Sequence, residues 1–222
     1  MIAATSRVAM AGRVAVEEDQ LSALYLRAAG QAFSYELALD AKGPLVPQGV
    51  QGYSVKSEKG QASYYYSQPF YRVTGTLTLP EGAIAVTGQG WLDHEWSSQP
   101  LAEDQTGWDW FSLHFNNGEK MMGFRLRDAG AGFTSATWIG ADGRPQPQAP
   151  GELRVTPLET ATVAGRSVPI RWRVELPEKG VDVTTRALNP RAWMDTRFPY
   201  WEGPNPVCGQ PCWARLSGDD GL

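Results

Sequence analysis

Residues able to do chemistry gather in one short part of the chain. Residues 88–98 read Gly-Gln-Gly-Trp-Leu-Asp-His-Glu-Trp-Ser-Ser, and residues 107–114 read Gly-Trp-Asp-Trp-Phe-Ser-Leu-His. The two stretches hold both histidines and four of the nine tryptophans. An imidazole or carboxyl group beside tryptophan faces suits proton transfer to an apolar ligand, because the rings shelter the ligand and stabilise a developing cation. The sequence therefore predicts a catalytic or binding site in this cluster.

Strand alternation divides the candidates into two faces. An extended segment at residues 91–96 places Trp91, Asp93 and Glu95 on one side of a sheet and turns His94 and Trp96 to the other. A barrel or sandwich with His94 and Trp96 facing inward would enclose an aromatic cavity with an imidazole. The catalytic candidates are His94, Asp93 and Glu95. The ligand-binding candidates are Trp91, Trp96, Trp108, Trp110, His114 and Tyr65. A structural role in core packing and hydrogen bonding is the competing interpretation of each residue.

Several other kinds of site are excluded by the residues themselves. The stretch His94-Glu-Trp-Ser-Ser98 lacks the second histidine of the zinc motif H-E-x-x-H, and neither a G-x-S-x-G elbow nor a phosphate-binding G-x-x-x-x-G-K loop occurs. Cys208 and Cys212 alone cannot complete a zinc site, so they are expected to form a local disulfide or to stay free. A net charge of −4 gives no basic surface for nucleic acid. We therefore expect no metal, no cofactor and no nucleic-acid partner.

The elements that must position these residues are predicted to be strands. Short apolar and polar alternations recur between turn signals, and Asn117-Gly118 between two of them is a strong hairpin signal. The expected strands are residues 33–39, 62–67, 71–79, 83–96, 108–115, 120–127, 133–139, 152–155 and 170–176. Residues 21–29 are expected as a short helix, residues 97–106 as the join between two sheet systems, and no closing strand is expected near the C-terminus. The predicted fold is all-β, an antiparallel sandwich or barrel.

A series of motifs in order resembles one bacterial family. The matching segments are residues 48–56, 62–69, 88–98, 107–111, 121–127 and 200–203. They resemble the AttH and carotenoid 1,2-hydratase (hydroxyneurosporene synthase) family, whose members contain two lipocalin-like β domains. The resemblance implies a partial N-terminal lipocalin-like domain at residues 1–100, with its sheet system incomplete, and a C-terminal lipocalin-like domain at residues 101–203. Residues 204–222 are then expected to form an irregular tail.

Two departures from the family pattern suggest a truncated member. The family's opening Asp-His-Gly and Glu-Trp-Trp-Tyr segments have no counterpart before Gly43, and after Gly203 the chain lacks the family's final glycine-spaced strand. The family's Asp-His-x-Trp element falls on Asp93, His94 and Trp96, which the hydratase branch implicates in adding water to an isoprenoid double bond. The Tyr-x-Asp pair of that branch is missing, because residues 121–125 read Met-Met-Gly-Phe-Arg. Asp109, Asp93 and Glu95 are the substitutes for the missing acid.

Three hypotheses for function follow from the residues and the resemblance. The first is an AttH-type protein that binds a hydrophobic small molecule, such as a carotenoid, lipid or terpenoid, in an aromatic cavity. The second is a hydratase or lyase acting on a carotenoid or other isoprenoid double bond, and the third is a non-functional fragment with open sheet edges. The sequence shows no signal peptide and no window long enough to cross a bilayer. By resemblance, complete members are expected to be extracytoplasmic and to associate with ABC transport.

Overall fold

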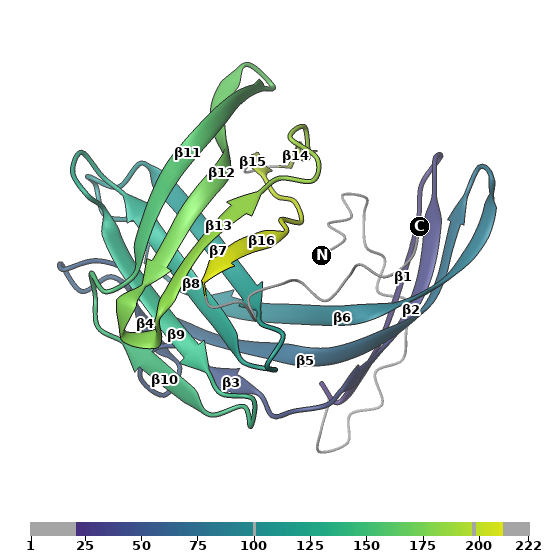
Figure 1. Cartoon of the computed structure of the whole chain (residues 1–222), viewed down its shortest axis with the longest axis horizontal. Coiled ribbons are helices and arrows are strands. Elements are labelled where there is room, and N and C mark those ends of the chain that lie inside the picture. The colour runs from purple at the N-terminus through teal and green to yellow at the C-terminus, as the bar shows by residue number, and fades with distance from the viewer. Residues whose placement is uncertain (1–20, 100, 197–198, 211–222) are drawn as a thin grey trace.

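The protein is built almost entirely from antiparallel strands that form an open bowl (Figure 1). The structure is a computed structural model, and it describes residues 21–99, 101–196 and 199–210. Within these ranges the only helical element is a single 3-10 turn, Pro177–Lys179, and no sheet closes into a barrel. None of the described residues forms a helix long and apolar enough to span a membrane. The predicted all-β class is confirmed.

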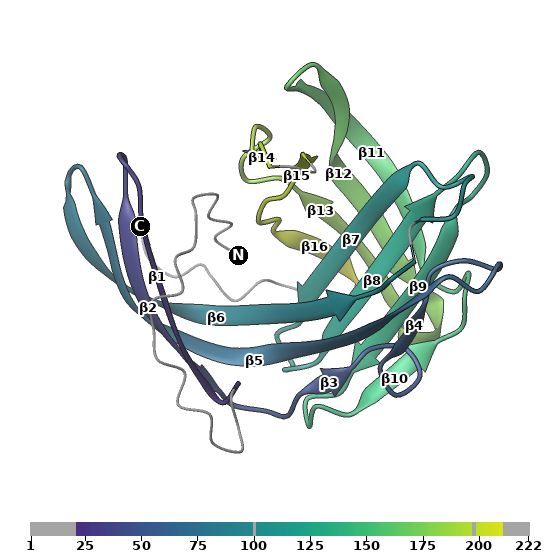
Figure 2. The same ribbon diagram turned by 180° about the vertical axis from the view of Figure 1, so that it is seen from behind.

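The first sheet forms the floor of the bowl. Its strands are β1 (Ala23–Ala29), β2 (Ser34–Ala41), β3 (Val46–Pro47), β4 (Tyr53–Val55), β5 (Ala62–Leu79) and β6 (Gly82–Trp96). Figure 2 shows β5 and β6 running side by side across the molecule, from β1 and β2 on one side to the second sheet on the other. The two strands expected at residues 62–67 and 71–79 are one strand, because a bulge between Gln68 and Tyr71 absorbs Pro69 without ending the pairing with β6. Because of the bulge, β5 continues as one long strand that pairs with β6 on both sides of Pro69.

The helix expected at residues 21–29 is wrong, since this segment is β1. Leu24, Leu26 and Ala28 lie on its more buried face, while Tyr25 and Arg27 are exposed. The apolar positions therefore repeat every two residues, which is the period of a strand and not of a helix. All seven residues of β1 pair with β2. Cross-strand pairing decides the structure of this segment against its local helix propensity.

The second and third sheets pack face to face as a sandwich. The second sheet contains β7 (Gly107–His114), β8 (Lys120–Arg127), β9 (Phe133–Ile139) and β10 (Pro145–Gln148). The third contains β11 (Arg154–Val163), β12 (Arg166–Leu176), β13 (Val181–Arg186) and β16 (Val207–Gln210). The core between them includes Phe111, Met121, Trp138, Trp172 and Val174. A separate pair, β14 (Trp193–Met194) with β15 (Tyr200–Trp201), lies above β13 and β16 in Figure 1.

Strand β8 is covered on both faces, and this explains its apolar run at residues 121–124. Met121 belongs to the core between the second and third sheets. Met122, Phe124 and Leu126, which alternate with it, pack with Tyr65 of the first sheet. A strand buried on both sides gains from apolar residues at every position. The second sheet therefore packs against the third sheet on one face and against the first sheet on the other.

Two connections lie where the sequence predicted them, and one prediction near the C-terminus is wrong. The Asn117-Gly118 hairpin is confirmed, since β7 and β8 pair from His114 and Lys120 onward and Gly118 adopts a positive φ of 87°. The segment at residues 97–106 connects the first sheet to the second. The prediction that no closing strand occurs near the C-terminus is wrong, because Val207–Gln210 forms β16 and pairs with β13. Cys208 on this strand is an exposed free thiol, and Cys212 lies outside the described residues.

Candidate functional site

A cleft of about 1630 Å³ opens between the first sheet and the sandwich. The wall that holds Asp93 comes from β5 and β6 of the first sheet and from the adjoining β7 of the second sheet, and β12, β13 and the β14 to β15 segment contribute to the other wall. Its lining includes all six predicted ligand-binding residues, Tyr65, Trp91, Trp96, Trp108, Trp110 and His114. Aromatic walls with polar side chains between them are typical of a cleft that binds a small molecule.

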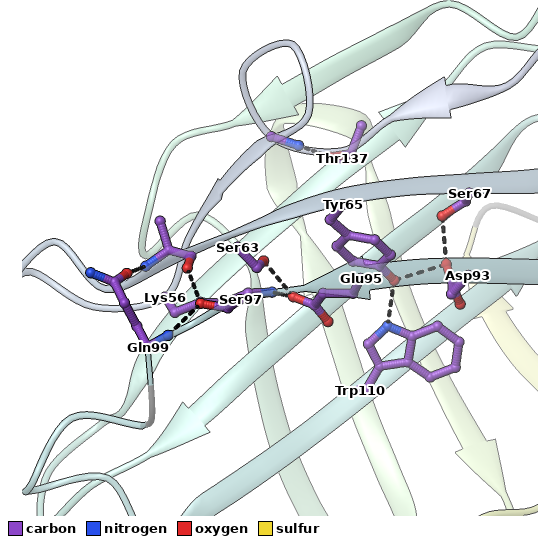
Figure 3. Close-up of polar contacts among 12 residues, drawn as sticks. Lys56, Ser63, Tyr65, Ser67, Asp93, Glu95, Ser97, Gln99, Trp110 and Thr137 are labelled. Atoms are coloured by element: carbon purple, nitrogen blue, oxygen red, sulfur yellow. Dashed lines mark hydrogen bonds and ion pairs between the residues drawn. The ribbon is translucent and has the colours of Figure 1, made fainter.

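Asp93 is the polar centre of this wall. Its Oδ1 atom accepts hydrogen bonds from the Tyr65 hydroxyl at 2.8 Å, Ser67 Oγ at 2.5 Å and Trp91 Nε1 at 2.9 Å. Trp110 Nε1 donates to the Tyr65 hydroxyl oxygen at 3.2 Å, which links the centre to β7 (Figure 3). The Asp93 side chain remains accessible to solvent in the cleft. A ligand can therefore reach a carboxyl group whose orientation is fixed by three donors.

The surroundings of Asp93 shift its pKa upward. Loss of bulk water around the carboxyl group is the largest influence and raises its pKa. The hydrogen bonds from Ser67, Trp91 and Tyr65 oppose this rise, and the charge of Glu95 adds to it. Burial, reinforced by the Asp93 charge, raises the pKa of Tyr65, so its hydroxyl stays protonated and keeps donating. A carboxyl group with a raised pKa in an aromatic cleft is suited to donate a proton.

A second polar pair lies next to this centre. Lys56 Nζ contacts Glu95 Oε1 at 2.6 Å, and Ser63 Oγ donates to the same oxygen at 2.5 Å. The ammonium group also lies 3.9 Å from the ring centroid of Phe124, a favourable cation–π distance. Desolvation is the largest influence on Lys56 and lowers its pKa, although Glu95 opposes that effect. Next to each other, this part of the wall thus carries the Asp93 and Glu95 carboxyl groups and a lysine that is already paired with Glu95.

His114 lies in the cleft as a neutral imidazole. Its Nδ1 atom is 3.2 Å from Lys120 Nζ and 3.1 Å from Gln89 Oε1, and its ring contacts the Trp91 ring edge-on. Desolvation, followed by the charge of Lys120, lowers the pKa of His114 to about 3. Burial lowers the pKa of Lys120 to about 8. His114 is therefore a hydrogen-bonding and aromatic contact at neutral pH and not a proton donor.

The low pKa of His114 predicts a loss of stability in mild acid. Because the folded pKa of about 3 lies below the unfolded value of 6.5, the unfolded state binds more protons between these values. Stability contributed by His114 is complete above pH 6.5 and is lost as the pH falls, at up to about 1.4 kcal/mol per pH unit. We expect His114→Gln to remove most of this slope in urea unfolding between about pH 6.5 and pH 5.

The His114 measurement needs one control. Asp93, with its raised pKa, binds more protons in the folded state, so its protonation opposes the loss of stability in acid. The comparison is therefore repeated with Asp93→Asn in both proteins. An unchanged slope after His114→Gln in that background would contradict the assigned imidazole environment.

His94 and Trp96 project from the outer face of β6, away from Asp93. Pairing of β6 with β5 sets His94 opposite Tyr66, and the two rings stack at 5.1 Å. The Trp96 ring stacks on Tyr64 at 5.7 Å and is 49% exposed, so it reaches the cleft only at the strand end. The expected inward-facing imidazole at His94 is therefore wrong. Alternation on β6 allows only one of its two sets to face the second sheet, and that set includes Asp93 and Glu95.

Asp109 is the remaining substitute acid, and its carboxylate accepts hydrogen bonds from two arginines. Arg125 Nε and Nη2 donate to its Oδ2 atom at 3.0 and 2.7 Å, and Arg127 Nη1 donates to Oδ1 at 3.2 Å. Its side chain is only 7% exposed. Within the described residues, no group of three or more histidine, cysteine or carboxylate side chains is arranged to hold a metal ion. The geometry thus leaves Asp93 as the acid best placed to meet a ligand.

Three polar residues of the site were not predicted from the sequence. Ser63 and Ser67 alternate with Tyr65 on β5, so an inward-facing Tyr65 would have indicated both. Lys56 comes from the segment after β4, and its approach to Glu95 depends on how β4 pairs with β5. No local sequence signal marks that contact.

The open antiparallel sheets around an aromatic cleft define a lipocalin-like β protein. The AttH-like family model matches residues 3–218, and the chain belongs to this family. An AttH protein from Nitrosomonas europaea is 30% identical with a TM-score of 0.78, over 86% of this chain and 61% of that chain. Kievitone hydratase from Nectria haematococca is 21% identical with a TM-score of 0.67, over 82% of this chain and 56% of that chain, and it shows a shared fold. No curated protein matches the chain.

Proposed function

We propose that the protein binds a neutral, elongated hydrophobic small molecule, with a hydroxyl group of the ligand at Asp93 and its apolar body along the tryptophans. The observation that carries this proposal is the accessible Asp93 carboxyl group, fixed by three donors in the wall of an aromatic cleft. Three donors on Oδ1 leave Oδ2 to bond a ligand hydroxyl. Carotenoid, lipid and terpenoid alcohols all have this chemistry.

The charges of the cleft wall favour a neutral ligand over an anionic one. Asp93 and Glu95 are two residues apart on β6, and Lys56 is already paired with Glu95. A ligand carboxylate placed at Asp93 would meet like charge, and the neighbouring Lys56 is already paired with Glu95, which disfavours binding. The cleft should therefore discriminate between an alcohol and the carboxylate of the same length.

A displacement titration tests this proposal. Phenylnaphthylamine, a neutral fluorescent probe, should bind the cleft, and decanol should displace it at a concentration about tenfold or more below that required for decanoate at neutral pH. Equal displacement by the two compounds would contradict the neutral-ligand assignment. Failure of the probe and of decanol to bind at all would contradict the binding function and favour the non-functional fragment.

We propose the addition of water to an isoprenoid double bond as a second candidate function. The upward shift of the Asp93 pKa supports it, because this shift makes the protonated carboxyl group, the form that can protonate an alkene, easier to reach. The proton of Asp93 would form a new C–H bond at one alkene carbon, and the other carbon would become a cation beside Trp91 and Trp110. Water would then form the C–O bond and return one proton to the Asp93 carboxylate. Similarity to kievitone hydratase is consistent with this chemistry at the level of the fold.

A further inference from the structure

Among the described residues, four buried side-chain oxygen atoms have no hydrogen-bond partner, and two of the four lie in the wall opposite Asp93. They are Thr185 Oγ1 on β13 and Asn205 Oδ1 in the segment before β16. Thr185 is only 2% exposed, and both residues line the cleft. A buried polar atom without a partner lowers stability, so such atoms are uncommon and call for an explanation. Thr185 and Asn205 both line the cleft, whereas the other two unpartnered atoms, Gln48 Oε1 and Ser54 Oγ, belong to residues outside its lining.

Strand pairing places these two residues on one face of the third sheet. Thr185 pairs with Val207, and the ladder continues through Arg186 N to Pro206 O at 3.3 Å. Asn205, two residues before Val207, therefore shares its face and is the diagonal neighbour of Thr185. Diagonal neighbours in a sheet are about 7 Å apart, a separation that one intervening hydroxyl group can bridge.

The hydrogen-bonding roles of the two atoms are complementary. Asn205 Nδ2 donates to the Gly203 carbonyl oxygen at 2.8 Å, which fixes Oδ1 as a free acceptor. The Thr185 hydroxyl can rotate to donate. An apolar surface borders the pair, because Trp172 is the cross-strand partner of Thr185 and also lines the cleft. The arrangement can therefore satisfy a group that accepts one hydrogen bond and donates another.

We propose that Thr185 and Asn205 form a second subsite, which binds a hydroxyl group at the far end of the ligand. The ligand hydroxyl accepts from Thr185 Oγ1 and donates to Asn205 Oδ1. This inference rests on the proposed function, in which Asp93 holds the first polar group. Together the two walls define the ligand class as an elongated apolar molecule with a hydroxyl group at each end.

Terminal diols of graded length test this subsite. Each diol is compared with the mono-alcohol of the same length in displacement of phenylnaphthylamine. At the length that spans the cleft, we expect the wild-type protein to bind the diol about five- to tenfold more tightly. Thr185→Val, which keeps the shape of the side chain and removes its hydroxyl, should erase that advantage and leave mono-alcohol affinity within about twofold.

Thr185→Ser serves as the matched control, because it keeps the hydroxyl group and should retain the preference for the diol. Equal affinity of diols and mono-alcohols at every length in the wild-type protein would overturn the subsite. A preference that survives Thr185→Val would also overturn it and would leave an ordered water as the partner of these atoms. Binding of mono-alcohols in either case would leave the proposed function standing, whereas no binding of any alcohol would contradict both proposals.

Discussion

Replacing Asp109 with alanine should lower the free energy of unfolding by about 3 kcal/mol, because it leaves charged arginine in a partly buried site without its partner. Arg125 makes two hydrogen bonds to this carboxylate, and its side chain is only 18% exposed. The estimate lies at the low end of the usual range for a broken buried ion pair, because Arg127, the other partner, is 41% exposed and keeps much of its hydration. Urea unfolding at neutral pH measures the change.

Asp182→Ala is a matched control for the Asp109 variant. Arg173 also makes two hydrogen bonds to the Asp182 carboxylate, at 2.9 and 2.8 Å, but both side chains are about half exposed. Solvent screens such a pair, so its removal should change stability far less. Equal losses from the two substitutions would show that Asp109 is not a buried structural anion, and would reopen its assignment as a possible acid.

Asp93→Asn should abolish water addition if the protein is a hydratase. Asparagine keeps the size and an acceptor oxygen of the side chain but cannot supply a proton at neutral pH. Loss of a general acid lowers turnover by about 100-fold or more. Turnover of an isoprenoid alkene is followed by mass spectrometry in isotopically labelled water, as incorporation of one labelled oxygen into the product.

The water-addition experiment separates Asp93 from its neighbours. Glu95→Gln should have a smaller effect, since Glu95 is held by Lys56 and Ser63. Turnover by the Asp93→Asn protein at more than about a tenth of the wild-type rate would exclude Asp93 as the proton donor. The absence of any turnover by the wild-type protein would remove the second candidate function and leave ligand binding as the proposal.

Local patterns predicted most of the long strands, and tertiary pairing decided the rest. Alternation and the Asn117-Gly118 turn located β6 to β9 within about a residue, because their chemistry is local. Segment 21–29 was misassigned because its strand structure depends on pairing with β2. The short strand Val207–Gln210 was missed for the same reason, since its proline-rich approach is ordered by β13.

The sequence indicated which residues of β6 share a face, but not which of the two faces lies toward the cleft. Alternation separated Asp93 and Glu95 from His94, and the structure keeps that division. Which set faces inward cannot be read from β6 alone, because a shift of one residue exchanges the two faces. The answer depends on distant contacts, chiefly Trp110 on Tyr65, which bring β7 over the Asp93 face.

The most direct test of the site is the affinity of decanol for the Asp93→Leu and His94→Ala proteins, measured by displacement of phenylnaphthylamine. Asp93→Leu should weaken decanol binding about tenfold, because the acceptor of the ligand hydroxyl is lost, while His94→Ala should match the wild-type protein because its side chain lies on the outer face. The opposite result, with normal binding by Asp93→Leu and weakened binding by His94→Ala, would contradict the assignment of the cleft as the ligand site.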